Sequence, residues 1–187
     1  MRIIGGNFKG KKILEPKDKE TRPLKDLTKE SIFNIINHSN KFSIVLEKSY
    51  VLDLFSGSGS FGLECLSRKA KHVCFVENYK GILPILKNNL SNLKTVKNYS
   101  IIEKNILIDI DFLEKKEKFD IIFLDPPYKE KEIHTILNNV YKFKTLKPDG
   151  IIIIHRHKKE RDNFPDKFKI IEEKKYGISK IIFGKFI

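Results

Sequence analysis

The feature of this sequence that most constrains its fold is a regular alternation of short apolar runs with longer amphipathic segments. Near-continuous apolar runs are typical of parallel strands covered on both faces by helices. They predict five strands, at Val51–Phe55, Val73–Glu77, Tyr99–Glu103, Phe119–Asp125 and Gly150–His155. Helices are expected between strands, at about Ser60–Lys69, Tyr79–Leu93 (with Pro84 in its first turns) and Lys131–Lys144. The fold class is therefore α/β.

The two ends of the chain depart from this alternation. Lys167–Glu172 and Lys180–Phe186 follow each other with no helix between them, so a hairpin with one antiparallel strand is expected. Before the alternation, Arg2–Ile4 and Lys12–Leu14 predict two short strands, and Asp26 is expected to cap a helix that runs to about Asn37.

Length and cysteine content limit the architecture. At 187 residues the chain is expected to form one domain, with residues 1–40 as an N-terminal extension and residues 41–187 as the core. Cys65 and Cys74 form no CxxC motif and fall on predicted core elements, so buried thiols are expected rather than a disulfide or a zinc site. The start lacks the apolar stretch of a signal peptide and no apolar run could span a bilayer, so a cytoplasmic protein without membrane contact is expected.

The charge is strongly basic and unevenly distributed. The chain carries 37 Lys and Arg against 24 Asp and Glu, a formal net charge of +13. Residues 1–48 hold 11 basic and 6 acidic side chains, residues 49–141 hold 13 and 12, and residues 142–187 hold 13 and 6. A neutral middle with basic ends indicates a polyanionic partner such as nucleic acid. Lysine-rich composition alone is the competing explanation.

A glycine-rich turn follows the first strand of the alternation. Asp53-Leu-Phe-Ser-Gly-Ser-Gly-Ser-Phe-Gly62 places Gly57, Gly59 and Gly62 in the spacing GxGxxG. Glycines allow close approach of a ligand, and the following helix offers free N–H groups. Glu77 lies 20 residues after Gly57, where an acid can hold ribose hydroxyls. This pattern alone fits a nicotinamide cofactor or S-adenosylmethionine.

Asp53 favours the second of these cofactors. Its carboxylate lies four positions before Gly57, where it would repel a pyrophosphate. The same group can accept hydrogen bonds from the ammonium of a methionine moiety. S-adenosylmethionine is therefore the expected cofactor, with binding residues Asp53, Phe55, Ser56, Gly57, Ser58, Gly59 and Glu77.

The motif Asp125-Pro126-Pro127-Tyr128 indicates the chemistry. Its two prolines fix the backbone and remove two donors, which leaves the Asp125 carboxylate and the Pro126 carbonyl as rigid acceptors. Acceptors of this kind can bind both N–H groups of an exocyclic amine on a planar base and direct its nitrogen at a methyl donor. Tyr128 can stack on a base that has been flipped out of its helix. These four residues are the expected catalytic set.

Other candidate sites have weaker signals. His155 and His157 could form a metal pair, but no third ligand is evident, and a solvated basic stretch with Arg156, Lys158 and Lys159 is the favoured interpretation, so no metal is expected. The N-terminal cations could contact RNA phosphates or simply be solvated: Arg2, Lys9, Lys11, Lys12 and Arg22.

With these motifs placed, the chain resembles the RsmD-type 16S ribosomal RNA guanine-N2 methyltransferases of bacteria over nearly its full length. The resemblance lies in the opening Met1-Arg-Ile-Ile-Gly-Gly-Asn-Phe-Lys-Gly-Lys-Lys12, in Thr21-Arg-Pro23, in Lys29–Asn34, in the two core motifs and in Tyr176-Gly177. It implies a Rossmann-like sheet of seven strands, and a flipped guanine held by Asp125, Pro126 and Tyr128. It also implies that Asn105 lies near the adenine of the cofactor, although many relatives have Asp there.

The family resemblance further implies 16S ribosomal RNA or the small ribosomal subunit as the partner, and nothing in the sequence demands more than a monomer. Three other functions stay open at this point. One is methylation of another nucleic-acid amine, such as adenine N6, which the Asp-Pro-Pro-Tyr motif also serves. The second is a nicotinamide oxidoreductase, although no catalytic Tyr-xxx-Lys is visible. The third is a ribosome-assembly protein whose methylation is incidental.

Overall fold

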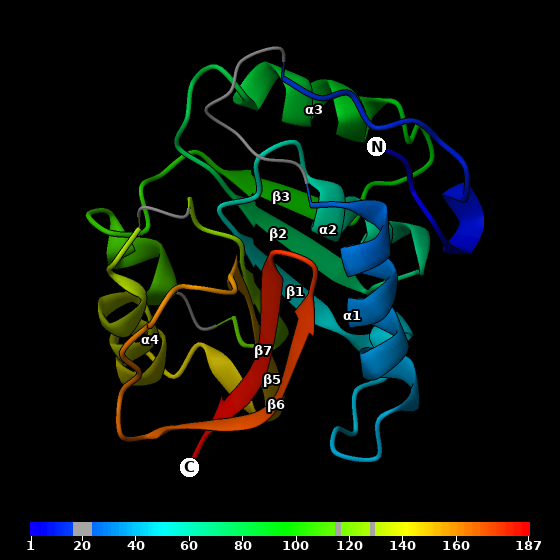
Figure 1. Cartoon of the computed structure of the whole chain (residues 1–187). Helices are drawn as coiled ribbons and strands as arrows, with labels where there is room; N and C mark the ends of the chain where they lie inside the picture. Colours follow the sequence, from blue (N-terminus) through cyan, green and yellow to red (C-terminus); the bar gives the residue numbers. More distant parts are fainter. Residues whose placement is uncertain (17–23, 115–116, 128–129) are drawn as a thin grey trace.

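The protein is built on one seven-stranded sheet (Figure 1). The computed structural model describes residues 1–16, 24–114, 117–127 and 130–187. The strands run in the order β3-β2-β1-β4-β5-β7-β6. The first five are parallel, and β7 is antiparallel to both β5 and β6. The predicted α/β architecture with a C-terminal hairpin is therefore confirmed, as is the Rossmann-like order with its reversal between β1 and β4.

The strands are β1 (Tyr50–Leu54), β2 (His72–Val76), β3 (Tyr99–Ile102), β4 (Phe119–Leu124), β5 (Leu146–His157), β6 (Phe168–Tyr176) and β7 (Ser179–Phe186). The α-helices are α1 (Asp26–His38), α2 (Ser60–Ser67), α3 (Leu83–Ser91) and α4 (Ile133–Lys142). Short 3₁₀ turns are η1 (Gly6–Phe8), η2 (Leu46–Lys48) and η3 (Ile110–Glu114).

The hydrophobic core forms two layers, one on each face of the sheet. Helices α1, α2 and α3 cover one face, where Phe33 and Phe61 stack with ring centroids 5.3 Å apart. Helix α4 and η3 cover the other face (Figure 1). The apolar side of α4 follows the helical repeat, and its buried residues are Ile133, Ile136, Leu137 and Val140. Because both faces are covered, the central strands are mostly apolar rather than alternating.

The N-terminal segment differs from the prediction of two short strands. Only one isolated antiparallel bridge forms, between Arg2 and Lys12. The chain between them is diverted by η1, where Gly6 has φ +71° and approaches the backbone of Ser67 so closely that a Cβ would lie 2.0 Å from its carbonyl oxygen. Backbone hydrogen bonds still join its two sides, from Ile13 N–H to the Met1 carbonyl at 3.0 Å and from Ile3 N–H to the Lys11 carbonyl at 2.9 Å. The segment is therefore a short, irregular hairpin that docks on α2.

Two further expectations are corrected at helix starts. Asp26 is the first residue of α1 rather than its cap, and Lys25 occupies the cap position without a side-chain bond. The carboxylate of Asp26 instead lies 3.6 Å from Arg2 and 3.7 Å from Lys29. Helix α3 begins at Leu83 rather than at Tyr79, and Pro84 lies in its first turn as predicted. Within the described residues, no helix is long and apolar enough to cross a membrane.

Candidate active site

The candidate site lies where the parallel strands end, at the point where the strand order reverses. Strands β1 and β4 are neighbours there, with Leu54 opposite Leu124. Asp125, the residue that follows β4, donates its backbone N–H to the Leu54 carbonyl at 3.4 Å. The turn after β1 and the Asp125 turn after β4 are therefore adjacent, as the sequence predicts for ligand-binding segments of an α/β sheet.

The turn between β1 and α2 has a constrained backbone. Phe55 has φ +60°, a left-handed conformation that is costly for a bulky side chain and is typical of functional sites. Gly57 and Gly59 also have positive φ, at 54° and 86°. The turn is closed by a hydrogen bond from the Gly59 N–H to the Ser56 carbonyl at 2.8 Å, and Ser56 donates its own N–H to Val76 at 3.0 Å.

The three glycines of the GxGxxG spacing have different roles. A Cβ on Gly62 would lie 2.2 Å from the Phe75 ring, so this glycine lets α2 pack tightly on β2. A Cβ on Gly59 would lie 2.6 Å from Leu86 of α3. A Cβ on Gly57 would meet nothing within 4 Å. Gly57 therefore faces open space, which leaves room for a ligand against its backbone.

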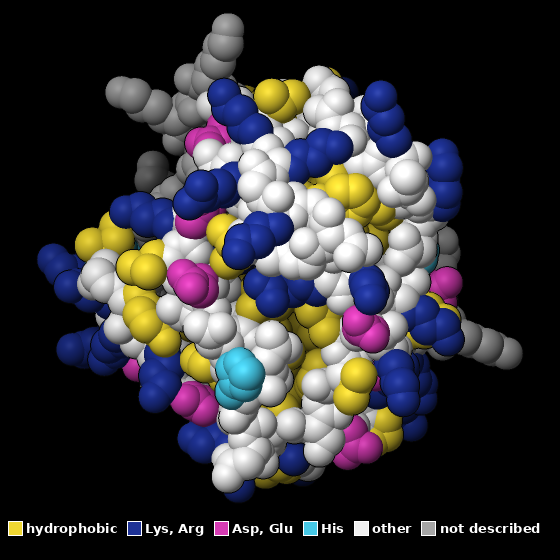
Figure 2. All heavy atoms as spheres, turned by 90° about the vertical axis from the view of Figure 1, so that its right-hand side faces the viewer, with side chains coloured by type: hydrophobic (Ala, Val, Ile, Leu, Met, Phe, Trp, Pro, Cys, Tyr) yellow, Lys and Arg dark blue, Asp and Glu magenta, His cyan; other side chains and the backbone are white. Residues whose placement is uncertain are grey.

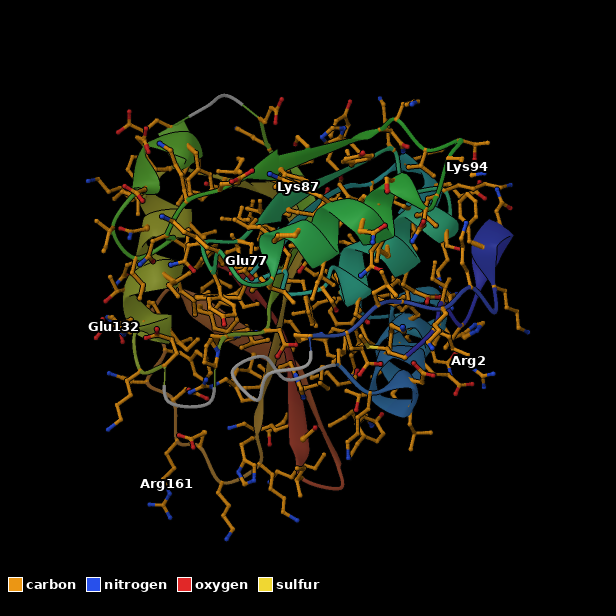
Figure 3. All side chains as sticks on the ribbon, turned by 90° about the horizontal axis from the view of Figure 1, so that it is seen from above. Arg2, Glu77, Lys87, Lys94, Glu132 and Arg161 are labelled. Atoms are coloured by element: carbon orange, nitrogen blue, oxygen red, sulfur yellow. The ribbon has the colours of Figure 1, made fainter. Side chains whose placement is uncertain are left out.

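Glu77 holds the glycine-rich turn from the end of β2. One carboxylate oxygen accepts the Gly57 N–H at 2.8 Å, and the other accepts the N–H groups of Asn78 and Tyr79, each at 2.9 Å. A carboxylate offers about four acceptor positions, so these three bonds leave capacity for one more donor. Glu77 lies near the middle of the molecule in the view of Figure 3.

Asp53 is buried at the end of β1, with 1% of its surface exposed. One carboxylate oxygen accepts the N–H of Gly62, in the first turn of α2, at 3.0 Å. Burial raises the pKa of Asp53 well above its usual range, and the nearby carboxylates of Asp125 and Glu77 raise it further. A cation bound beside Asp53 would offset this unfavourable environment.

Asp125 carries the only side chain of its turn that can accept a hydrogen bond among the described residues 125–127. It is partly exposed, while Pro126 is buried and Pro127 is exposed. Its Oδ1 lies 2.7 Å from Nδ1 of His155, and Nε2 of His155 lies 2.9 Å from the Ser179 hydroxyl. Tyr128, the last residue of the predicted catalytic set, lies outside the described residues.

The prediction of a solvated basic stretch at residues 155–159 is wrong in part. His155 and Arg156 are buried, because β5 continues to His157 and pairs with β7 on one side. Only Lys158 and Lys159 are exposed as expected. In the part of the chain that the structure describes, no group of three or more His, Cys, Asp or Glu side chains could hold a metal ion. Cys65 and Cys74 are buried thiols, as predicted.

A buried asparagine connects the glycine-rich turn to the N-terminal segment. The side-chain amide of Asn89, on α3, donates to the carbonyl oxygens of Ser58 at 2.9 Å and Leu14 at 3.0 Å. Its oxygen accepts the Leu14 N–H at 2.8 Å. The residues just before position 17 are thereby fixed beside the turn that follows β1.

The predicted RNA-contacting cations are not all near this site. Phe8 donates its N–H to the Ser67 hydroxyl at 2.9 Å, which places Lys9 at the end of α2 away from the glycine-rich turn. Lys11 contacts the Asn92 carbonyl at the corresponding end of α3. An eight-residue helix is about 12 Å long, so these lysines are separated from the turn by roughly that distance.

The backbone of Arg2 lies closer to the turn, because Lys29 donates to its carbonyl at 2.6 Å and approaches Ser60 at 3.3 Å. Lys12 stands opposite Arg2 in the isolated bridge, and Arg22 lies outside the described residues. Asn105 follows β3 at the same edge as Glu77, and its side chain accepts the Leu107 N–H at 2.9 Å. An adenine contact by Asn105 stays a prediction.

Sequence reasoning missed His155, Arg156, Ser179 and Asn89 as parts of the site. His155 is the last residue of the predicted strand Gly150–His155 and Arg156 follows it, so the parallel topology would have placed both at the same edge as Asp125. Ser179 and Asn89 carried no recognisable signal, because each contacts the site through pairing that only the tertiary structure reveals.

Comparison with known proteins identifies the family. The model of the family described as conserved hypothetical protein 95 matches residues 1–185. The chain belongs to this family, the RsmD family. The RsmD-family protein of Haemophilus influenzae, named ribosomal RNA small subunit methyltransferase D, is 33% identical over 95% of this chain and 90% of its own. The protein of the same name from Buchnera aphidicola (subsp. Acyrthosiphon pisum) is 32% identical over 92% and 86%.

A solved structure of another protein has the same fold. The protein described as "Putative methyltransferase yhhF from Escherichia coli" superposes with a TM-score of 0.82 and 26% sequence identity, over 100% of this chain and 97% of that one. The family resemblance and the methyltransferase fold expected from the sequence are therefore confirmed. The roles of individual site residues stay predictions.

Proposed function

We propose that this protein transfers a methyl group from S-adenosylmethionine to the exocyclic N2 amine of a guanine in 16S ribosomal RNA. The observation that carries the proposal is the placement of the Asp125 carboxylate, after β4, directly beside the glycine-rich turn after β1. A methyl donor and an amine acceptor can therefore meet at one edge of the sheet. Membership of the RsmD family, with relatives named as methyltransferases of the small-subunit ribosomal RNA, supports ribosomal RNA as the substrate.

The residues of the glycine-rich turn fit the proposed cofactor. Gly57 has open space over its backbone, and Glu77 keeps acceptor capacity that suits a ribose hydroxyl. The buried carboxyl of Asp53 is suited to the ammonium of the methionine moiety, because a buried acid is stabilised in its charged form by a nearby cation. When bound, S-adenosylmethionine supplies an electrophilic methyl group.

The Asp125 turn provides the acceptors for the target amine. The amino nitrogen of guanine is a poor nucleophile, because its lone pair is delocalised into the ring. The Asp125 carboxylate and the Pro126 carbonyl would accept its two N–H groups, orient the lone pair and stabilise the positive charge that develops on nitrogen. Proline at positions 126 and 127 keeps these acceptors rigid. Tyr128 would stack on the flipped base.

The remaining parts of the proposal concern the RNA and the state of the protein. Arg2 and Lys12, with Arg22, are proposed to contact RNA near the cofactor turn, and Lys9 and Lys11 to contact phosphates farther along the strand. The partner is the small ribosomal subunit or its RNA, and the protein acts as a monomer in the cytoplasm, where that RNA is found.

The decisive experiment transfers a labelled methyl group from S-adenosylmethionine to small ribosomal subunits from cells that lack this protein. The RNA is then digested and its nucleosides are identified by mass. N2-methylguanosine at one position is the expected product. N6-methyladenosine would instead support the adenine alternative, and cofactor binding without any labelled RNA would move the substrate to DNA or another amine.

Replacement of Asp125 tests the catalytic assignment. Asp125→Ala removes the acceptor for the target amine, so methyl transfer should fall by at least about 100-fold, the scale for losing one preorganised polar group. Affinity for S-adenosylmethionine, measured by calorimetry, should change by less than about threefold, because the Gly57 and Glu77 contacts are untouched. Near-normal turnover in this variant would remove Asp125 from the catalytic role.

A further inference from the structure

A buried histidine contacts the proposed catalytic carboxylate from the neighbouring strand. His155 lies on β5 with 4% of its side chain exposed, and its Nδ1 is 2.7 Å from Oδ1 of Asp125. An ionised carboxylate can only accept hydrogen bonds, so Nδ1 carries the proton and donates it. Nε2 of the neutral ring then accepts the hydroxyl proton of Ser179, 2.9 Å away. The chain of donors runs from Ser179 through His155 to Asp125.

This contact determines which part of Asp125 faces a substrate. With Oδ1 occupied by His155, rotation of the carboxylate about its last torsion is restricted. The other oxygen, Oδ2, stays available to accept an N–H of the target amine. The Asp125 side chain is 19% exposed, whereas that of His155 is 4% exposed, so the carboxylate can reach a ligand and the imidazole lies behind it.

A buried arginine holds the following part of the same turn. Arg156, with 1% of its side chain exposed, donates from Nη2 to the Glu130 carbonyl at 2.7 Å and from Nη1 to the Pro127 carbonyl at 3.3 Å. Its Nε donates to the buried carboxylate of Asp162 at 2.8 Å. A buried guanidinium is costly unless it is paired in this way. Arg156 thus binds the chain on both sides of residues 128–129.

We propose that His155 and Arg156 are positioning residues for the methyl-transfer reaction. His155 orients the Asp125 carboxylate, and Arg156 fixes the backbone after Pro127, so that adjacent residues of one strand hold both ends of the amine-binding turn. Neither residue touches the substrate in this arrangement. The proposal rests on the proposed function for its consequence in catalysis, but the contacts themselves can be tested without substrate.

Substitutions at His155 separate orientation from simple packing. His155→Leu fills a similar volume with an apolar side chain and removes the donor to Asp125. His155→Asn retains an N–H donor close to the position of Nδ1. The expected result in the RNA methylation assay is a kcat reduced about 10- to 100-fold for His155→Leu, the range for a hydrogen bond to a charged group. His155→Asn should recover most of that loss.

The affinity measurements and a matched control identify the step that is affected. KM for RNA and the Kd for S-adenosylmethionine should each change by less than about threefold in His155→Leu, because binding contacts are intact. His157→Asn, two residues along the same strand, should leave kcat within about twofold. A His155→Leu variant that folds and keeps normal kcat overturns the proposal. A parallel rise in the cofactor Kd, with kcat recovered at saturation, would also overturn it.

The NMR spectrum of the histidine rings tests the His155–Asp125 contact without RNA and without turnover. In protein labelled with ¹⁵N at histidine, the His155 ring should be in the Nδ1–H form, and the signal of that proton should shift in Asp125→Ala. An Nε2–H form in the wild-type protein would overturn the proposal even if methylation is found. If the spectrum agrees but no RNA is methylated, the proposed function fails while the contact stands.

A milder substitution, at Ser179, tests the proposal if the His155→Leu variant does not fold. Ser179→Ala removes the partner of Nε2 and leaves the His155–Asp125 contact in place. Its kcat should fall only about two- to fivefold, and the Nδ1–H form should become less populated in the same spectrum. No change in either quantity would show that the orientation of His155 does not depend on this chain of donors.

Discussion

At the scale of single residues, Asp53 has conflicting effects on stability and binding. Its burial raises the pKa, so between the pKa of the unfolded chain and that of the folded protein the folded state binds more protons. Stability therefore decreases as the pH rises through this interval, because ionisation of the buried acid is unfavourable. The same ionised carboxylate is the proposed partner of the cofactor ammonium. The ionised carboxylate of Asp53 thus serves the proposed cofactor contact and lowers the stability of the folded protein.

Replacement of Asp53 with asparagine should separate these two effects. Asp53→Asn keeps an oxygen for the Gly62 N–H but carries no charge. We expect a higher free energy of unfolding than wild type in urea titrations at pH 8, with a smaller difference at pH 5. We also expect S-adenosylmethionine to bind about 10- to 100-fold more weakly, the range for a lost charge-assisted hydrogen bond.

A variant of a second aspartate, Asp120, tests whether the expected effects are specific to Asp53. Asp120, at the other end of the sheet on β4, accepts the Tyr50 N–H and pairs with Lys147, each at 2.8 Å. Asp120→Asn should not raise stability and should leave cofactor affinity unchanged. Equal cofactor affinity for wild type and Asp53→Asn would exclude the carboxylate as the partner of the ammonium.

Sequence reasoning located these acids but not the residues behind them. Asp53 lies at the end of an apolar strand, and Glu77 and Asp125 each follow one directly, so their common edge could be derived from the parallel topology. The roles of His155 depend on partners 30 and 24 residues away along the chain, Asp125 and Ser179. Such pairings arise from the register between β5, β4 and β7, which no local pattern specifies.

At the scale of elements, helix α3 couples the N-terminal segment to the glycine-rich turn. Asn89→Ala would leave the N–H and carbonyl of Leu14 and the carbonyl of Ser58 without their side-chain partner. We expect a loss of about 1–3 kcal/mol in the free energy of unfolding, since buried polar groups are left unpaired. The affinity for S-adenosylmethionine should also fall several-fold, because the turn loses one of its supports.

The neighbouring residue provides the comparison for Asn89. Asn88 lies on the exposed side of the same helix. Asn88→Ala should change the free energy of unfolding by less than about 0.5 kcal/mol, the usual range for an exposed surface position. Chemical denaturation of both variants and calorimetry with the cofactor test this. Equal behaviour of the two variants would show that α3 supports the turn through packing alone.

The elements themselves were predicted best where one local signal dominates. The apolar runs of β1, β2 and β4 and the helical repeat of α4 indicated the type and approximate bounds of these elements. The run of β5 indicated a strand, but β5 begins at Leu146, four residues before the predicted start. The N-terminal segment was predicted as two strands because its apolar residues flank glycines. Its two sides do pair through backbone hydrogen bonds, but only one bridge forms among the described residues. Contacts with Ser67 and Asn89, tens of residues away, also shape the segment, and local preference could not predict them.

At the scale of the whole molecule, the basic charge is spread widely. Figure 2 shows Lys and Arg side chains distributed over the face that carries α1, with acidic side chains between them. In Figure 3, Arg2 and Arg161 lie at opposite margins of a view in which Glu77 is near the centre. A nucleic acid that places a base at Asp125 could therefore meet cations on more than one side of the site. The net charge of +13 favours such contacts without specifying sequence.

Salt dependence distinguishes these contacts from compositional charge. Each phosphate neutralised by Lys or Arg releases counterions, so affinity falls steeply with salt. With roughly four phosphates contacted, the Kd for 16S RNA should rise about 100-fold between about 50 and 200 mM salt. The Kd for S-adenosylmethionine, measured over the same range, should change little because its binding groups are enclosed at the sheet edge. A flat response for RNA would mean that the lysines are a property of the composition and that the RNA is held by other contacts. A steep response for RNA alone would show that Lys and Arg side chains contact RNA phosphates and that cofactor binding does not depend on them.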